Sequence, residues 1–243
     1  MKQLRDKRIG IVGGMGPAAG HYFAQTLTSL VQAARDQDHP VIIHLSDPSI
    51  PDRTAFLTNG GKDPVPSITR AIKQLEACGA DVICIPCNTA HAPQLFNRYS
   101  RYVRTPIIHM VNETVDYIAA HYPKTQRIGI LGTDGTRAAG SYDIAALRHE
   151  LQICHPADDM QHEVMRLIYT IKRRGVRPGD GRALARAANN MDVDVFVVAC
   201  TELSMLTDEC RKYIDLPVVD SLEVLAQTAL GTQRKISHHP VQG

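Results

Sequence analysis

The sequence contains one short pattern twice, and each copy ends in a cysteine. Residues 81–89 read DVICIPCNT and residues 194–202 read DVFVVACTE, so an Asp-Val pair opens an apolar run that a cysteine and a polar residue close. Upstream, RIGIVG at 8–13 matches RIGILG at 127–132. The matched segments are offset by 113 and 119 residues, so the two halves keep nearly the same internal spacing. This predicts a duplicated fold with one thiol at the same place in each half.

The two matched cysteines, Cys87 and Cys200, each follow a buried strand at the start of a helix. Open α/β sheets bind ligands at the carboxyl ends of their strands, and a helix N-terminus favours the thiolate over the thiol. Taken singly, each cysteine could equally be a small buried hydrophobic residue. Because the repeat matches both positions, we favour a pair facing a shared cleft. There, one thiol removes a proton from a carbon and the other delivers one to the opposite face.

Short β-branched runs alternate with longer amphipathic stretches, which is typical of βαβ units on parallel sheets. The 243 residues suit two similar α/β domains, each a parallel-type sheet flanked by helices and related by a pseudo-twofold duplication. We assign 1–117 plus 224–243 to the first domain, which carries Cys87, and 118–223 to the second, which carries Cys200. Strands are expected at 8–13, 41–45, 81–86, 106–109, 127–132, 151–154, 193–198 and 217–219. Helices are expected from Pro17, at 65–78, from 89, at 111–121, 140–150, 157–174 and 179–191, from Thr201, and at 221–230, with an irregular loop at 46–63 and a polar tail at 232–243.

Composition excludes several classes of protein. A net charge of +2 and an aromatic content of 5% give little support to nucleic-acid binding. No signal-peptide core and no apolar run of membrane-spanning length is present, so we expect a cytoplasmic protein whose six cysteines are mostly free thiols. Cys84 and Cys87 form a Cys-x-x-Cys spacing, but Cys84 falls inside a strand and no second pair follows, which argues against metal or redox use.

Two further segments are candidates for ligand binding. The turn at 13–16, Gly-Gly-Met-Gly, loosely fits a dinucleotide fingerprint, but its backbone N–H groups could equally hold a carboxylate. Arg53 lies on the irregular loop at 46–63, where its guanidinium could grip a substrate carboxylate through two hydrogen bonds. The alternative is an exposed arginine paired with Asp52. We assign no catalytic role to His91 or His109.

Taken together, four motifs resemble the aspartate/glutamate racemase family, in the cofactor-independent branch nearest the aspartate racemases. They are 13–17, 50–54, 86–91 and 200–203. The resemblance implies an active site between the two domains, with Cys87 and Cys200 as the acid/base pair and with no pyridoxal phosphate or metal. It also implies a homodimer. The implied substrate-binding residues are Met15, Arg53, Asn88, Thr89, Thr201, Glu202 and Arg173.

Three positions depart from the pattern of this family. Arg173 stands where the family has a lysine before a glycine, with Lys172 beside it. Ala199 replaces the usual glycine before the second cysteine, and Gly20 with His21 replaces a small hydroxyl segment after the first turn. These departures leave the substrate preference open.

The function predicted from the residues and the resemblance is a racemase that interconverts L- and D-aspartate, or glutamate, by a two-base mechanism. A related superfamily enzyme, a decarboxylase or cis–trans isomerase acting on a small dicarboxylate, is the alternative among enzymes. A non-catalytic protein that clamps a small anion between two lobes is the alternative in another class, and a nucleotide-dependent oxidoreductase comes third.

Overall fold

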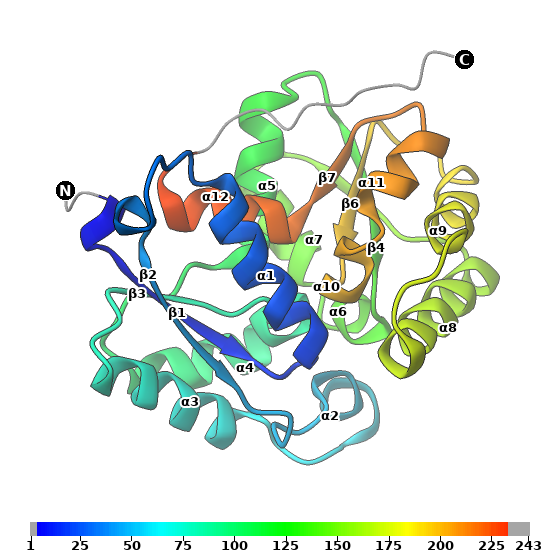
Figure 1. Ribbon diagram of the computed structural model, residues 1–243. Coiled ribbons are helices and arrows are strands. Elements are labelled where there is room, and N and C mark those ends of the chain that lie inside the picture. The colour runs from blue at the N-terminus through cyan, green and yellow to red at the C-terminus, as the bar shows by residue number, and fades with distance from the viewer. Residues whose placement is uncertain (1–3, 233–243) are drawn as a thin grey trace.

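The computed structural model describes residues 4–232 and contains two parallel β-sheets flanked by helices (Figure 1). This confirms the predicted α/β class. Most of the predicted tail at 232–243 lies outside the described residues. The first sheet has the order β2-β1-β3 and the second the order β5-β4-β6-β7. Their strands are β1 (Arg8–Gly13), β2 (Val41–Ser46), β3 (Val82–Cys84), β4 (Arg127–Gly132), β5 (Gln152–Cys154), β6 (Val195–Ala199) and β7 (Val218–Asp220).

The duplicated segments occupy equivalent strands of the two sheets. The copies of the Arg-Ile-Gly-Ile motif form β1 and β4, which pair in parallel with β3 and β6. Every residue of β3 and β6 is buried, as expected for parallel strands covered on both faces. The two cysteine motifs therefore leave their sheets at corresponding places.

The helices divide between two lobes, which we define by the sheet that each half of the chain forms. Those of the first half are α1 (Pro17–Leu30), α2 (Arg53–Asn59), α3 (Val65–Ala77), α4 (Pro93–Tyr99) and α5 (Met110–His121), with short 3₁₀ turns η1 (Leu4–Asp6), η2 (Asp36–Asp38), η3 (Asn88–His91) and η4 (Ser100–Tyr102). Those of the second half are α6 (Asp134–Ala138), α7 (Ser141–Ala146), α8 (Asp158–Arg174), α9 (Asp180–Ala188), α10 (Thr201–Ser204), α11 (Thr207–Cys210) and α12 (Ser221–Leu230), with η5 (Leu147–His149) and η6 (Arg211–Tyr213).

Three elements differ from the sequence expectation. The segment 46–63 is not wholly irregular, because Asp52 accepts a hydrogen bond from the Ala55 amide at 2.8 Å and so caps α2. The strand expected at 106–109 is reduced to one bridge between Ile107 and Ile83. The helix expected at 140–150 begins after Gly140, whose left-handed backbone separates α7 from the preceding α6.

Two helices cross between the lobes. Helix α5 follows the first sheet but packs its apolar face against β4, β6 and β7 of the second. Helix α12 follows the second sheet but packs on β1 and β3 of the first, and in Figure 1 it lies beside α1. The predicted domain limits at 117/118 and 223/224 fall within these two helices. The exchange buries apolar residues of each lobe against the other, and it brings the start of α12 close to both cysteine loops.

Candidate active site

Cys87 and Cys200 line the same cavity, at the carboxyl ends of β3 and β6. Its volume is about 20 Å³, which is room for roughly one water molecule. Both lobes contribute to its wall. The lining residues are Met15, Asp52, Arg53, Thr54, Cys87, Asn88, Thr89, Thr133, Met165, Ile168, Tyr169, Lys172, Ala199, Cys200, Thr201 and Glu202.

The backbone presents the two thiols in the same way. Each cysteine has an extended conformation and occupies the N-cap of a single helical turn, η3 for Cys87 and α10 for Cys200. Cys87 is 7% exposed and Cys200 is 6% exposed. At both cysteines the capping side chain accepts no hydrogen bond from the turn that follows it. The sequence repeat is therefore also a repeat of local geometry.

Cys200 has a charged neighbourhood. Its Sγ donates a hydrogen bond to Oε2 of Glu202 at 3.1 Å, and the other oxygen of Glu202 lies 3.4 Å from Nζ of Lys172. Glu202 is only 4% exposed. Gly16 makes room for this carboxylate, because a Cβ there would lie 2.8 Å from Oε1 of Glu202. The structure thus lines up a thiol, a buried carboxylate and an ammonium group.

This neighbourhood raises the pKa of both the Cys200 thiol and the Lys172 ammonium group. Burial raises the pKa of the Cys200 thiol well above its usual range, and the Glu202 carboxylate raises it further, whereas Lys172 lowers it. Burial alone would lower the pKa of Lys172, but the negative charge of Glu202, with smaller contributions from the two thiols, outweighs burial and raises it. Lys172 therefore stays a cation at the edge of the cavity, and Cys200 is protonated at neutral pH.

The two residues that follow Cys87 are bonded to uncharged groups. The side chain of Asn88 accepts a hydrogen bond from the Tyr142 hydroxyl at 2.7 Å and donates one to Ser221 at 3.0 Å. The Thr89 hydroxyl lies 2.9 Å from that of Thr133 and 3.1 Å from that of Thr136. Both side chains thus connect the first lobe to the second. The oxygen and one N–H of the Asn88 side chain are engaged in this way.

Arg53 is held inside the molecule by backbone carbonyls. Its guanidinium donates to the carbonyls of Ile50, Pro51 and Met15 at 3.2, 2.9 and 3.1 Å, and it is 8% exposed. Its Nε–H is buried without a hydrogen-bond partner. The exposed pair with Asp52 that we considered as an alternative is not formed. A fixed guanidinium with a spare donor at a cavity suits a carboxylate ligand.

Helix α8 places Lys172, rather than Arg173, at the cavity. Met165, Ile168, Tyr169 and Lys172 all line it and have the i, i+3, i+4, i+7 spacing of one helical face. Arg173 is turned by about 100° from Lys172, is exposed, and is absent from the lining. The resemblance located the right turn of the helix, but the phase of the helix selects the neighbouring residue.

The other predicted site residues have definite places. Met15, Asn88, Thr89, Thr201 and Glu202 all line the cavity, as does Ala199, whereas Gly20 and His21 do not. Besides Lys172 and Ala199, six lining residues were not among the predicted site residues. These are Asp52, Thr54, Thr133, Met165, Ile168 and Tyr169. The last three were detectable, because their helical spacing ends on a lysine.

Several residues stay outside the site. Burial lowers the pKa of His91 to about 3 and that of His109 to about 4, so both are neutral rings. Cys84 is fully buried in β3, and burial raises its pKa to about 12. Over residues 4–232, no group of three or more histidine, cysteine, aspartate or glutamate side chains is arranged to hold a metal ion. Within the same range, no helix has the length and apolar character to span a membrane.

Known proteins match both the sequence and the structure. Residues 12–229 match the profile of a family described as Asp/Glu/Hydantoin racemase. Picrophilus torridus aspartate racemase has a similar structure, with a TM-score of 0.80 and 30% sequence identity, over 93% of this chain and 94% of that one. The broad specificity amino-acid racemase RacX of Bacillus subtilis (strain 168) is 28% identical over 233 residues, or 92% of this chain and 97% of the relative. Glutamate racemase from Francisella tularensis, solved in complex with D-glutamate, shares the fold with a TM-score of 0.65 at 15% identity, over 98% of this chain and 87% of that one.

Proposed function

Because the chain belongs to the Asp/Glu/Hydantoin racemase family, we propose that it interconverts L- and D-aspartate, with glutamate as the alternative substrate, without pyridoxal phosphate. One observation carries the proposal: two thiols from equivalent strand ends line one cavity. The likeness to an aspartate racemase at 30% identity supports aspartate as the first substrate to test.

In the proposed mechanism the two thiols act on opposite faces of the α-carbon. The cysteine that is ionised takes the α-proton, the C–H electron pair stays on the substrate as a carbanion, and the other thiol then gives its proton to the opposite face. The sulfurs finish with their protonation states exchanged. The reverse reaction starts from that exchanged state, so no external oxidant or acid is consumed.

The carbanion must be stabilised by the pocket, since no electron sink is invoked. Delocalisation into the α-carboxylate makes an enediolate, whose negative oxygens need positioned donors. Suitable groups are the backbone N–H groups at the starts of η3 and α10, the spare Nε–H of Arg53 and the ammonium of Lys172. In a cavity closed to water these contacts are stronger than in solution.

Substrate entry is proposed to involve the Lys172–Glu202 pair. The cavity between the thiols is too small for an amino acid, but a neighbouring cavity of about 520 Å³ shares Asp52, Arg53, Lys172 and Glu202 with it. Displacement of the Lys172 side chain, which is 32% exposed, would join the two spaces. A substrate carboxylate arriving from this side would then replace Glu202 as the partner of Lys172.

A single incubation tests the proposal. The purified protein is held with L-aspartate or L-glutamate in heavy water, and the products are separated on a chiral column and weighed by mass spectrometry. We expect the D-enantiomer, with one deuterium at the α-carbon, and no carbon dioxide. Neutral and basic amino acids belong in the same panel, because the relative RacX is named for broad specificity. If no amino acid gains deuterium or loses chirality, the proposed activity is wrong.

We further propose that the protein is a homodimer in the cytoplasm, and that it binds a small amino-dicarboxylate substrate and no nucleic acid. Sedimentation velocity of the purified protein reports the first point directly. A mass near twice the 26.7 kDa of the chain is expected, and a single monomeric species would contradict it.

A further inference from the structure

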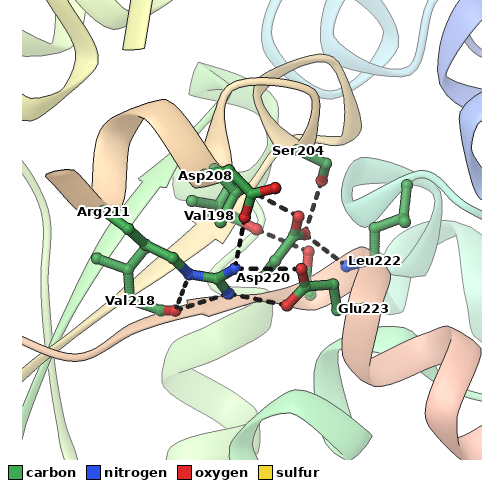
Figure 2. A network of polar contacts seen from close by, with 10 residues as sticks. Val198, Ser204, Asp208, Arg211, Val218, Asp220, Leu222 and Glu223 are labelled. Atoms are coloured by element: carbon green, nitrogen blue, oxygen red, sulfur yellow. Dashed lines mark hydrogen bonds and ion pairs between the residues drawn. The ribbon is translucent and has the colours of Figure 1, made fainter. Parts of the chain in front are cut away.

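The two residues at the junction of β7 and α12, Asp220 and Ser221, lie outside the cavity but are bonded to the loops of both cysteines. Both are fully buried. Figure 2 shows Asp220 at the centre of a polar network that reaches α10 on one side and the start of α12 on the other. Neither residue lines the cavity, so neither takes part in the proposed proton transfers.

Asp220 is connected to the Cys200 loop. Its carboxylate accepts hydrogen bonds from the hydroxyl of Ser204 at 2.7 Å, the hydroxyl of Thr207 at 2.9 Å and the amide of Leu222 at 2.8 Å. The amide of Ser204 in turn donates to the carbonyl of Cys200 at 3.2 Å. Asp220 thereby holds the one-turn helix α10, which is too short to be rigid by itself.

Ser221 is connected to both cysteine loops. Its hydroxyl accepts from Nδ2 of Asn88, the residue after Cys87, at 3.0 Å. The same hydroxyl donates to the carbonyl of Val198, two residues before Cys200, at 2.8 Å. One oxygen atom therefore joins two loops from different lobes.

An outer shell holds the junction itself in place. Arg211 binds the carboxylate of Glu223 at 2.8 Å and the carbonyl of Val218 at 3.1 Å, and it also contacts the exposed Asp208 (Figure 2). Helix α12 continues from the junction into the apolar core of the first lobe. The junction thus links the first lobe to the Cys200 loop, so the position of one fixes the position of the other.

We propose that Asp220 and Ser221 are positioning residues that set the separation of the two thiols. The inference rests on the proposed function for its consequence in catalysis, since a proton transfer between a thiol and a carbon requires close, fixed distances. A misplacement of about 1 Å costs on the order of 100-fold in rate. Without the Ser221 hydroxyl, Asn88 and Val198 each lose a buried partner, and the direct link through Ser221 between the two cysteine segments is lost.

Ser221→Ala is the principal test, and Ser141→Ala is its matched control. Ser141 is also buried, but its hydroxyl has no hydrogen-bond partner, so the same atom is removed without breaking a link. We expect Ser221→Ala to lower kcat by about 10- to 100-fold with KM changed less than about threefold, and to enlarge the kinetic isotope effect of α-deuterated substrate. Thr207→Val removes one bond to Asp220 and should give a smaller effect of the same kind. If Ser221→Ala turns over like Ser141→Ala, the proposal is overturned.

A second measurement needs no substrate and separates this inference from the proposed function. Iodoacetamide labelling of each cysteine is followed by peptide mass spectrometry in the wild type and both serine variants. In Ser221→Ala the labelling rates of Cys87 and Cys200 should both change several-fold, while the buried Cys84 and Cys210, which lie outside the cavity, keep their rates. If all four rates rise together, the serine merely stabilises the fold. Unchanged rates at Cys87 and Cys200 would equally refute the inference, whether or not the protein racemises an amino acid.

Discussion

The two cysteine loops are alike in backbone and unlike in charge. Both cysteines cap a single helical turn at the end of a buried strand, with nearly equal exposure. Cys200, however, donates to a buried carboxylate that is paired with an ammonium, whereas the side chains that follow Cys87, Asn88 and Thr89, are bonded to uncharged groups. Duplication therefore made the two backbones alike, as the proposed two-sided reaction requires, and the residues after each cysteine made the two sides chemically different. Because its pKa is raised, we propose that Cys200 is the acid in the ligand-free protein, which leaves the role of base to Cys87 in the mechanism proposed above.

The largest expected effect comes from removing either thiol. Cys87→Ala and Cys200→Ala should each lower racemisation by on the order of 10³-fold or more, because each reaction needs one proton acceptor and one proton donor. Chiral chromatography of the products measures the loss. Cys84→Ala is the control, since Cys84 is buried in β3 away from the cavity, and it should retain activity. Full turnover by either site variant would disprove the two-thiol assignment.

Lys172 and Arg173 offer a second large contrast. Lys172→Ala should lower kcat/KM by about 10- to 100-fold, which is the usual effect of losing a charged hydrogen-bond partner. Arg173→Ala removes the same charge from the adjacent, exposed position and should change kcat/KM less than about twofold. Steady-state kinetics with both variants checks this. Equal losses would show that the side chain from either position reaches the substrate.

Glu202→Gln tests the asymmetry between the thiols. The carboxylate raises the pKa of Cys200, so its replacement by a neutral amide should move the alkylation of Cys200 to lower pH and leave that of Cys87 where it is. Labelling of wild-type Cys200 should require a higher pH than labelling of an ordinary thiol, whose pKa is about 8.5. The alkylation rate of each cysteine is measured by peptide mapping from about pH 6 to about pH 10, which covers the titration range of a thiol.

Glu202→Gln should also lower the rate of racemisation. Racemisation has an equilibrium constant of one, so kcat/KM for the two enantiomers must fall by the same factor even though the change lies beside one cysteine only. We expect a loss of about tenfold or more, within the range for disturbed acid–base catalysis. Unaltered Cys200 labelling in Glu202→Gln would contradict the assignment of Cys200 as the resting acid.

The smallest expected effect concerns the Cys87 side of the cavity. A Cβ at Gly135 would lie 2.7 Å from Oγ1 of Thr54 and 2.9 Å from Cγ2 of Thr89, so Gly135→Ala should push the first turn of α6 away from the Cys87 loop. Overpacking of this kind costs about 1–3 kcal/mol of stability, which urea denaturation measures. The labelling rate of Cys87 should change more than that of Cys200. A change in labelling rate confined to Cys200 would contradict this prediction.

Local patterns in the sequence predicted much of the fold. The buried β-branched runs at 8–13 and 127–132, and the glycine and proline turns that end them, predict strands that the structure confirms. The helix expected at 157–174 corresponds to α8 within one residue. In each of these segments the local pattern and the tertiary contacts favour the same conformation. The strand expected at 106–109 failed because a run so short depends on neighbours for its hydrogen bonds, and it pairs only with Ile83, through the Pro106 carbonyl and the Ile108 amide.

The sequence alone determined the α/β class, the duplication and the position of each cysteine at a strand end, because these follow from periodicities of two and 3.6 residues and from turn residues acting over a few positions. Tertiary structure decided the rest. The phase of α8 brings Lys172 to the cavity and leaves Arg173 in solvent, the exchange of α5 and α12 ties the lobes together, and Ser221 meets Asn88 although 133 residues separate them. Such contacts depend on how the two sheets and their helices pack in space, and no local pattern records the distance between groups so far apart in the chain.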